Sequence, residues 1–443
     1  MFTIDIQAPA SKSVSHRTCI AAAMAEGQSQ ISGVLESNDL IATRACLGAA
    51  GAVFEGEDGA YTVTGVAGVP QGGTDEPANL DMNESGTSCR LLTAIVAAGR
   101  GSFLVHGRGR LHDRPIGDLA NALTKLGVTV HWREKVGCPP LVIETSGLSA
   151  GTTSISLEES SQYLSGLLMA APMAAGPVTI EVTGKKVVSW PYVALSLMVM
   201  DDFGIDFSVE GKTDTGFMPL DWRALETVVP GQIRFQVKPS VYTARTYVVE
   251  GDWSNASYFL AAGALGKHPV RVNGLRRDSL QGDKSILDIL STMGATVEWN
   301  DTGDAVTVTA EKLHGAELDM GHCPDLVPTV AMAASQASSQ TTIRNVAHLR
   351  IKESDRLEAV ANEISKLGVP VQTFDDGLTV TPSGDVSGTS YDFCTYDDHR
   401  LAMSISLLEL AGVNVRLDNP KCVDKSFPEF FTRWDVIRRA NVD

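Results

Sequence analysis

Residues 122–132 read ALTKLGVTVHW, in which an amphipathic helical run, a glycine and an alternating strand follow one another. A glycine just past a helix takes the left-handed backbone conformation that ends it. The alternation after the glycine is typical of a strand with one buried face. The same pattern recurs in ACLGAAGAVFE (45–55), LMVMDDFGIDFSV (197–209), ILSTMGATVEW (289–299) and EISKLGVPVQTF (363–374). A unit of helix, glycine stop and strands therefore repeats along the chain.

The spacing of these glycine stops predicts the domain organisation. The widest interval separates Gly204 from Gly294, and within it a strand-like stretch leads into the helical segment after Glu250. Three units precede Glu250, two follow it, and the C-terminus has room for a third. We therefore expect two α/β domains of similar build, with a ligand site in the cleft between them.

Composition excludes several classes of protein. The 443 residues are 43% hydrophobic and 20% charged, as in a globular chain with large cores. The net charge of −17 argues against nucleic acid or an anionic membrane as a partner, but a small anion responds to local cations. No apolar stretch is long enough to span a membrane, and the N-terminus lacks the features of a signal peptide. Seven scattered cysteines, without C-x-x-C pairs, predict reduced thiols, no zinc site and a cytoplasmic protein.

The stretch SKSVSHR (11–17) places Lys12 and Arg17 at the start of an apolar helical run. Cations there oppose the helix dipole, whereas free backbone amides favour an anion. A phosphate or carboxylate held between these cations and the amides would explain the pattern. Ser13 and Arg17 are four residues apart and can share a helix face. A solvated basic turn is the alternative.

Two further helix starts are rich in small polar residues. In DMNESGTSCRLL (81–92), Gly86 would allow a ligand to approach the backbone closely. In EESSQYLSGLLMAAP (158–172), Ser160, Ser161 and Gln162 could bind hydroxyls or phosphate oxygens. The alternative for both stretches is ordinary helix capping, in the first by Ser85, Thr87 or Ser88.

The loop GRGRLHDRPIG (107–117) carries Arg108, Arg110 and Arg114 beside a stiffening Pro115. A guanidinium on a stiff loop suits two-pronged binding of a carboxylate or phosphate. A solvated surface loop is the alternative.

The stretch HLRIKESDRLEAV (348–360) combines cations with carboxylates. Lys352 and Arg356 are four residues apart, so we expect two like charges on one helix face, next to Glu353 and Asp355. A buried carboxylate among cations can be kept in a chosen protonation state for proton transfer. The alternative is a charged, exposed helix face. Similar charged residues stand before or inside apolar runs at Asp325, His399, Arg400 and Lys425.

Taken together, eight motifs resemble those of the EPSP (5-enolpyruvylshikimate-3-phosphate) synthase family and occur in the family's order. They are SKSVSHR, ESGTSCR, RPIGDLANAL, SSQYLSGLLMAAP, VEGDWSNASYFLAA, HLRIKESDR, DDHRLAMS and DKSFPEFF. The resemblance implies two domains of three βαβαββ repeats each, like inside-out α/β barrels, with the active site in the interdomain cleft. Residues 11–250 would form the first domain, and residues 1–10 with 251–443 the second.

The family reaction transfers the enolpyruvyl group of phosphoenolpyruvate (PEP) to the 5-hydroxyl of shikimate 3-phosphate, without metal or organic cofactor. We also expect a monomer. It implies that Asp325 takes the hydroxyl proton, that Glu353 protonates the PEP methylene, and that Lys12 reaches both substrates, although the split of acid and base roles stays open. The implied shikimate 3-phosphate ligands are Lys12, Ser13, Arg17, Ser160, Ser161, Gln162, Ser189, Tyr192, Asp325, His348 and Lys352. The implied PEP ligands are Lys12, Gly86, Arg114, Gln162, Glu353, Arg356, His399, Arg400 and Lys425.

The chain departs from the family pattern in places, notably at position 84, and several alternative functions remain to be weighed. Glu84 stands where many members have Asn, and its charge would repel the PEP phosphate unless it turns away. The related UDP-N-acetylglucosamine enolpyruvyl transferases typically carry a reactive cysteine in the arginine loop, and this loop has none. A non-catalytic anion-binding protein on the same scaffold would be expected to lose Asp325 and Glu353. Both residues are present, which disfavours this alternative. The charge of −17 disfavours a nucleic-acid end-processing enzyme of related fold.

Overall fold

The structure is a computed structural model that describes residues 2–384 and 386–442. The chain divides into two compact units. We call Ser11–Val249 the N-terminal unit, and Met1–Ala10 with Glu250–Asp443 the C-terminal unit. Within the described residues, no helix has the length and apolarity needed to cross a membrane.

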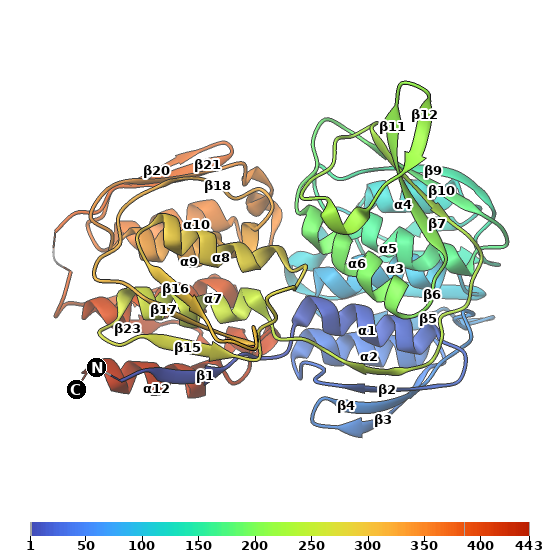
Figure 1. The fold of residues 1–443 in the computed structure, drawn as a ribbon. Helices are drawn as coiled ribbons and strands as arrows, with labels where there is room; N and C mark the ends of the chain where they lie inside the picture. Colours follow the sequence, from blue (N-terminus) through green and yellow to red (C-terminus); the bar gives the residue numbers. More distant parts are fainter. Residues whose placement is uncertain (1, 385, 443) are drawn as a thin grey trace. The chain divides into compact units, whose positions relative to one another are not determined.

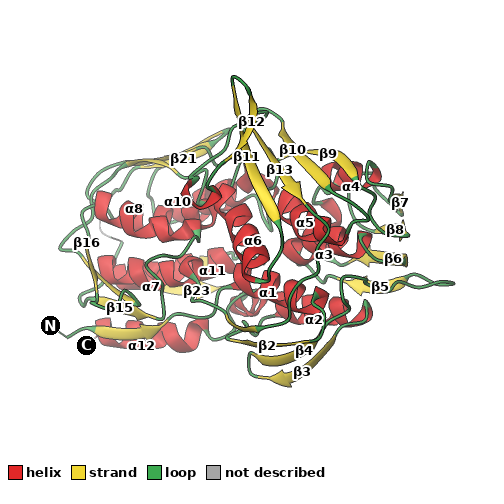
Figure 2. Ribbon diagram, turned by 45° about the vertical axis from the view of Figure 1, so that its right-hand side comes forward, coloured by secondary structure: helices red, strands yellow, loops and turns green. Residues whose placement is uncertain are grey.

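Most helices lie inside their unit with the sheets outside them, whereas α12 (Phe430–Val442) lies at the outer edge beside β1 (Ile4–Gln7) (Figures 1 and 2). The N-terminal unit contains α1 (Lys12–Met24), α2 (Asn38–Ala49), α3 (Gly86–Ala97), α4 (Gly117–Thr124), α5 (Gln162–Ala170) and α6 (Trp190–Asp202). The C-terminal unit contains α7 (Trp253–Leu265), α8 (Ile286–Thr292), α9 (Val327–Ala334), α10 (Arg356–Ser365), α11 (His399–Ile405) and α12 (Phe430–Val442).

The sequence of α7 explains why such helices lie inside. Its residues WSNASYFLAAGAL include no charge, and every one except Leu265 is buried. A helix that is apolar all round must be covered on all sides. The strands instead alternate, as in Val270–Asn273, where Val270 and Val272 are buried and Arg271 is exposed. One face of each such strand packs on helices and the other meets solvent.

The N-terminal unit has three mixed sheets, in the orders β14-β2-β4-β3, β5-β6-β8-β7 and β12-β11-β13-β10-β9. In the middle sheet the chain runs β5, α3, β6, α4, β7, β8, which is one complete βαβαββ repeat. The strands are β2 (Gln28–Ser32), β3 (Val53–Glu57), β4 (Ala60–Thr64), β5 (Ala78–Asp81), β6 (Gly101–His106), β7 (Thr129–Trp132), β8 (Leu141–Thr145), β9 (Gly151–Ser156), β10 (Val178–Thr183), β11 (Phe207–Thr213), β12 (Gly216–Pro219), β13 (Ile233–Val237) and β14 (Thr246–Val248).

The C-terminal unit has sheets in the orders β1-β15-β17-β16 and β18-β19-β21-β20, and a two-stranded sheet β22-β23. Its last repeat runs β22, α11, β23, α12, which matches the first four elements of the βαβαββ repeat. The strands are β1 (Ile4–Gln7), β15 (Val270–Asn273), β16 (Thr296–Trp299), β17 (Ala305–Thr309), β18 (Glu317–Asp319), β19 (Thr341–Arg344), β20 (Val371–Phe374), β21 (Gly377–Val380), β22 (Ser390–Phe393) and β23 (Asn414–Leu417).

Each unit takes one strand from a distant part of the chain. Strand β1 pairs in parallel with β15, Ile4 opposite Val270, and lies beside it in Figure 1. Strand β14 pairs in parallel with β2, Tyr247 opposite Ile31. Thus β1, which precedes α1 in sequence, completes a sheet of the C-terminal unit, and β14 fills the corresponding place in the N-terminal unit.

The glycine stops predicted from sequence are confirmed. Helices α2, α4, α6, α8 and α10 each end just before one of these glycines, and β3, β7, β11, β16 and β20 follow. All five have positive φ, which L side chains adopt only at a steric cost. The values are 107° at Gly51, 93° at Gly127, 79° at Gly204, 100° at Gly294 and 74° at Gly368.

Ser or Asp caps begin the helices on which many of the candidate residues lie. A side-chain oxygen accepts a hydrogen bond from a backbone amide of the first turn at Ser11, Ser85, Asp252, Asp355 and Asp398. Each cap contributes about 1 kcal/mol and fixes where its helix starts. The residues just after the caps are thereby held in place.

Candidate active site

Lys12 is the first residue of α1 and forms an ion pair with Asp39, Nζ to Oδ2 2.5 Å. Asp39 lies in the first turn of α2 and is buried. Only 15% of the Lys12 side chain is exposed, so the alternative of a solvated basic turn is wrong. Our sequence reasoning missed Asp39, although an acidic residue in a first helical turn is a recognised signal.

Arg17 is almost fully buried and binds groups of the protein itself. Its Nε donates to Ser196 Oγ at 2.7 Å, and Nη1 to the Ser13 carbonyl at 2.8 Å. Its Nη2 donates to the Tyr192 carbonyl at 2.8 Å and to Ser165 Oγ at 3.3 Å. Burial lowers the pKa of Arg17 to about 10. Arg17 therefore ties α1 to α5 and α6, and its contact with a substrate stays a prediction.

Gly86 and Arg114 lie in contact although they are 28 positions apart in the sequence. The rest of helix α3 and strand β6 lie between them in the chain. A Cβ added at Gly86 would lie 2.5 and 2.6 Å from Nη1 and Nη2 of Arg114, so the guanidinium rests on the glycine backbone. Gly86 opens α3, and the cap is Ser85, one of the three residues named for the capping alternative. The carboxylate of Glu84 lies beside Gly109, where an added Cβ would be 2.7 Å from Oε1.

Gln162, at the head of α5, is tied to the same region. Its Oε1 accepts from Arg90 at 3.1 Å and its Nε2 donates to Thr87 Oγ1 at 2.9 Å. Arg90 also donates to the carbonyl of Pro115, directly after Arg114. Gly86, Arg114 and Gln162 thus form one cluster in the N-terminal unit. Arg90 holds this cluster together, and its role was not predicted from the sequence.

A buried chain of polar side chains joins the starts of α1 and α3. His16 Nδ1 lies 2.8 Å from Thr43 Oγ1, which is 2.7 Å from Ser88 Oγ, and Ser88 donates to Ser85 Oγ at 2.7 Å. Burial, and then the nearby charges of lysine and arginine side chains, lower the pKa of His16 well below its usual value. His16 is therefore neutral. This series of hydrogen-bonded side chains links the start of α1 at residue 12 to the start of α3 at residue 86.

Two other predicted residues lie at the start of α6. Ser189 is buried and has a left-handed backbone, φ 55°, directly before the helix. Tyr192, in its first turn, accepts from Arg17 and Ser196 through its carbonyl oxygen. Ser160 and Ser161 are both buried before α5, where Ser160 Oγ accepts from the Gln162 amide at 3.2 Å.

Arg356 is the centre of the charged cluster in the C-terminal unit. Its Nε donates to Asp398 Oδ2 at 2.7 Å, Nη1 to Asp325 Oδ1 at 3.0 Å, and Nη2 to Glu353 Oε2 at 2.8 Å. The Arg356 side chain is 2% exposed, Asp398 0%, Glu353 14% and Asp325 19%. The structure thereby brings together three predicted residues, 325, 353 and 356, and adds Asp398, which was not predicted.

Arg400 holds the second oxygen of Asp325. Its Nη2 donates to Asp325 Oδ2 at 2.7 Å and its Nη1 to Ser254 Oγ at 2.5 Å. Burial raises the pKa of Asp325, but the charges of Arg400, Arg356 and Lys352 more than offset this and leave the pKa below its usual range. Asp325 is therefore ionised at neutral pH. Burial lowers the pKa of Arg356, and its carboxylate neighbours more than restore it.

The segment before Arg356 is not helical, which corrects one prediction. Ala347–Ile351 forms a 3₁₀ turn, residues 352–355 are irregular, and α10 begins only at Arg356, capped by Asp355. Lys352 and Arg356 consequently do not share a helix face. The alternative of an exposed charged helix face is also wrong, since Arg356 is buried among carboxylates.

The remaining predicted residues also lie in the C-terminal unit. His348 is buried in the 3₁₀ turn, His399 is buried at the start of α11, and Lys425 ends the 3₁₀ helix Pro420–Lys425. Among residues 2–384 and 386–442, no group of three or more His, Cys, Asp or Glu side chains has a metal-binding arrangement.

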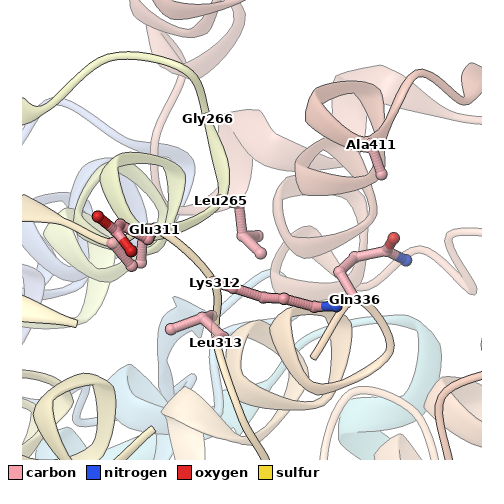
Figure 3. A pocket seen from close by; sticks show the side chains of 9 residues that line it. Leu265, Gly266, Glu311, Lys312, Leu313, Gln336 and Ala411 are labelled. Carbon is pink, nitrogen blue, oxygen red and sulfur yellow. The ribbon is translucent and has the colours of Figure 1, made fainter. Parts of the chain in front are cut away.

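A surface pocket of 240 Å³ in the C-terminal unit lies elsewhere (Figure 3). In Figure 3 the side chain of Lys312 extends toward Gln336. The lining residues are Ala264, Leu265, Gly266, Ala310, Glu311, Lys312, Leu313, Gln336 and Ala411. They include none of the predicted site residues, so this pocket is not the candidate site.

The geometry suits the binding of anions next to a proton-transfer group. Carboxylates of the chain hold the cations: Asp39 holds Lys12, and Asp325 holds both Arg356 and Arg400. An incoming phosphate or carboxylate can share these donors, because a guanidinium has five N–H groups. The carboxylates of Asp325 and Glu353 both pair with the guanidinium of Arg356. They can therefore carry out acid–base chemistry beside an anion bound there.

Comparisons with known proteins show which family the chain resembles. The family model for EPSP synthase (3-phosphoshikimate 1-carboxyvinyltransferase) matches residues 2–434. The chain is 39% identical to the 3-phosphoshikimate 1-carboxyvinyltransferase of Thiobacillus denitrificans, covering 98% of this chain and 96% of that protein. It is 38% identical to the enzyme of the same name from Sulfurovum sp., covering 96% and 95%.

Among solved structures, the EPSP synthase of Acinetobacter baumannii has a TM-score of 0.75 and 26% identity to this chain. The match covers 99% of this chain and 96% of that one. The resemblance seen in eight sequence motifs is thereby confirmed over nearly the whole length, and the chain belongs to the EPSP synthase family.

Proposed function

We propose that this chain transfers the enolpyruvyl group of PEP to the 5-hydroxyl of shikimate 3-phosphate and releases phosphate, a step of the shikimate pathway toward chorismate and aromatic amino acids. The observation that carries the assignment of roles is the cluster around Arg356. Two carboxylates, Asp325 and Glu353, lie on one buried guanidinium, and a second arginine, Arg400, holds Asp325. Family membership supports the reaction, and this cluster supplies groups for its proton transfers.

Substrate binding is divided between the two units in this proposal. The N-terminal unit binds shikimate 3-phosphate through Lys12, Ser13, Arg17, Ser160, Ser161, Gln162, Ser189 and Tyr192, and the C-terminal unit adds Asp325, His348 and Lys352. PEP is bound by Lys12, Gly86, Arg114 and Gln162, together with Glu353, Arg356, His399, Arg400 and Lys425. Two anionic substrates repel each other, so their joint binding needs this excess of cations.

The proposed chemistry has an addition and an elimination. Glu353 donates a proton to the methylene carbon of PEP, and positive charge develops on the adjacent carbon, which nearby carboxylates stabilise. The 5-hydroxyl oxygen bonds to that carbon while Asp325 accepts its proton. The carbon–oxygen bond to phosphate then breaks, and the departing phosphate takes up the proton that Asp325 had accepted. Removal of a proton from the new methyl group gives the enol ether. Glu353 is placed to take back that proton, so the acid is regenerated.

Arginine binding of Asp325 has a consequence for this base. A carboxylate held by two guanidinium groups is a weak base. Binding of the PEP carboxylate or phosphate to Arg356 and Arg400 would neutralise part of their charge and raise the pKa of Asp325. In the proposed scheme the donor substrate therefore prepares the base for the acceptor hydroxyl.

An acceptor comparison tests the proposal. The purified chain is incubated with PEP and either shikimate 3-phosphate or UDP-N-acetylglucosamine, and released phosphate is measured. We expect release only with shikimate 3-phosphate. Release only with the UDP-sugar would overturn the assignment in favour of the related transferase family.

We further propose that the enzyme is a cytoplasmic monomer. Light scattering after size-exclusion chromatography tests the oligomeric state: a mass near 47.1 kDa is expected. A stable mass twice as large would contradict it.

A further inference from the structure

The loop that precedes α11 has an unusual backbone. Tyr396 and Asp397 both have a φ of 53°, the left-handed region that non-glycine residues seldom adopt. Two such residues in succession persist only where surrounding contacts hold them, and they occur preferentially at functional sites. Asp398 and Arg400 follow directly, and both belong to the cluster around Arg356.

A buried carboxylate that the proposed chemistry does not use holds this loop. Glu363 of α10 has an exposure of 0%. Its Oε2 accepts from the Cys394 amide at 2.9 Å and from Lys366 Nζ at 2.6 Å, and its Oε1 accepts from the Tyr396 hydroxyl at 3.1 Å. A carboxylate is costly to bury unless it is paired and hydrogen-bonded, and here both oxygens are engaged. The two loop contacts lie on either side of Thr395.

The other side of the loop is held by residues after β23. Asp418 Oδ1 accepts from both the amide and the hydroxyl of Thr395 at 2.8 Å, and Asn419 Nδ2 donates to Asp397 Oδ1 at 2.7 Å. The side chain of Glu363 is buried, whereas Asp418 is exposed. Bonds to a buried charged group are the stronger restraint, because water cannot replace them.

The geometry points to Glu363 as a positioning residue for the donor-substrate side of the active site. It fixes the 394–397 loop in its left-handed conformation, which directs Asp398 onto Arg356 and onto the Arg400 amide. Arg400 then presents its guanidinium from a fixed helix start. This inference rests on the proposed function, since it takes Arg356 and Arg400 as PEP ligands.

Steady-state kinetics of Glu363→Ala and Glu363→Gln test the inference. Loss of both loop contacts in Glu363→Ala should raise KM for PEP about 10-fold or more, with KM for shikimate 3-phosphate within about two-fold of wild type. The predicted shikimate 3-phosphate ligands lie largely in the N-terminal unit, which is why the two constants should separate. Glu363→Gln keeps an oxygen for the Cys394 amide and should restore most of the PEP affinity.

A second variant and a control keep the test decisive. Tyr396→Phe removes a single contact to Glu363 and should raise KM for PEP about 3-fold, even if Glu363→Ala fails to fold. Arg416→Gln breaks an exposed ion pair to Asp392 in the neighbouring sheet and should change neither constant. Equal rises in both KM values, or an unchanged KM for PEP in Tyr396→Phe, would overturn the inference. An inactive wild type would instead overturn the proposed function.

Discussion

Arg356 and Asp398 form an ion pair in which both side chains are almost completely buried, 2% and 0% exposed, with Nε 2.7 Å from Oδ2. Asp398 also accepts from the Ser354 hydroxyl at 3.1 Å and from the Arg400 amide at 3.0 Å. One carboxylate thus orients the arginine at the start of α10 and caps the helix that carries the other arginine. Removing Asp398 takes away the most deeply buried of the three carboxylates that pair with Arg356 and also the cap of α11, which is far more costly than losing a surface pair.

Asp398→Ala should therefore lower the free energy of unfolding by about 3–5 kcal/mol. Urea unfolding followed by circular dichroism measures this change. Asp392→Ala is the matched control, because the Asp392–Arg416 pair is exposed and should leave stability unchanged within error. Equal effects of the two substitutions on the free energy of unfolding would show that burial of the Arg356–Asp398 pair does not add to stability.

Gly86→Ala should weaken PEP binding, because the new methyl group would occupy the space of the Arg114 guanidinium. Loss of a well-placed charged contact corresponds to about 1.5–3 kcal/mol, a rise in KM for PEP of about 10- to 150-fold. Gly48→Ala in α2 is the control, since no atom lies within 4 Å of the added Cβ. A normal KM for PEP in Gly86→Ala would mean that Arg114 does not bind the donor.

Glu353→Gln should reduce kcat by about 10²–10⁴, the usual contribution of a general acid or base. The amide can still accept from Arg356 through its oxygen, so the cluster should stay folded. Binding of shikimate 3-phosphate, measured by calorimetry, should stay within about two-fold of wild type. A large loss of that binding would show instead that Glu353 has a structural role.

Asp325 predicts a specific dependence of stability on pH. Its pKa is lower in the folded chain than in the unfolded chain, so the unfolded state takes up the proton first. The stabilisation from Asp325 is therefore complete above the unfolded pKa and lost as pH falls below about 4. The difference in Tm between wild type and Asp325→Asn should be largest near pH 7 and shrink below pH 4. A constant or growing difference would contradict the lowered pKa.

The sequence predicted the features that depend on local chemistry. The glycine stops, such as Gly127, follow from backbone sterics, and the cap at Ser85 follows from the short polar side chain that precedes an apolar run. Close motifs also pointed correctly to Glu353 and Arg356 as neighbours. The helix expected over residues 352–356 was wrong because the Asp355 cap starts α10 four residues later than the charge spacing implied.

Other features depend on long-range contacts that no local pattern reveals. Asp39 meets Lys12 only because α1 and α2 pack together, and Glu363 meets Tyr396 across 33 residues. Asp398 was visible only as an acidic residue before a helix, which indicates a cap but not a partner 42 residues away. Such pairings follow from packing of the helices, and the sequence alone could not supply them.

The stoichiometry of the reaction tests the account most directly. The purified chain is given PEP and shikimate 3-phosphate, and phosphate and the enolpyruvyl ether are quantified together by phosphorus NMR and mass spectrometry. The account predicts that both products form in a one-to-one ratio and that Glu353→Gln slows both equally. Phosphate without the ether, or no phosphate at all from these two substrates, would contradict it.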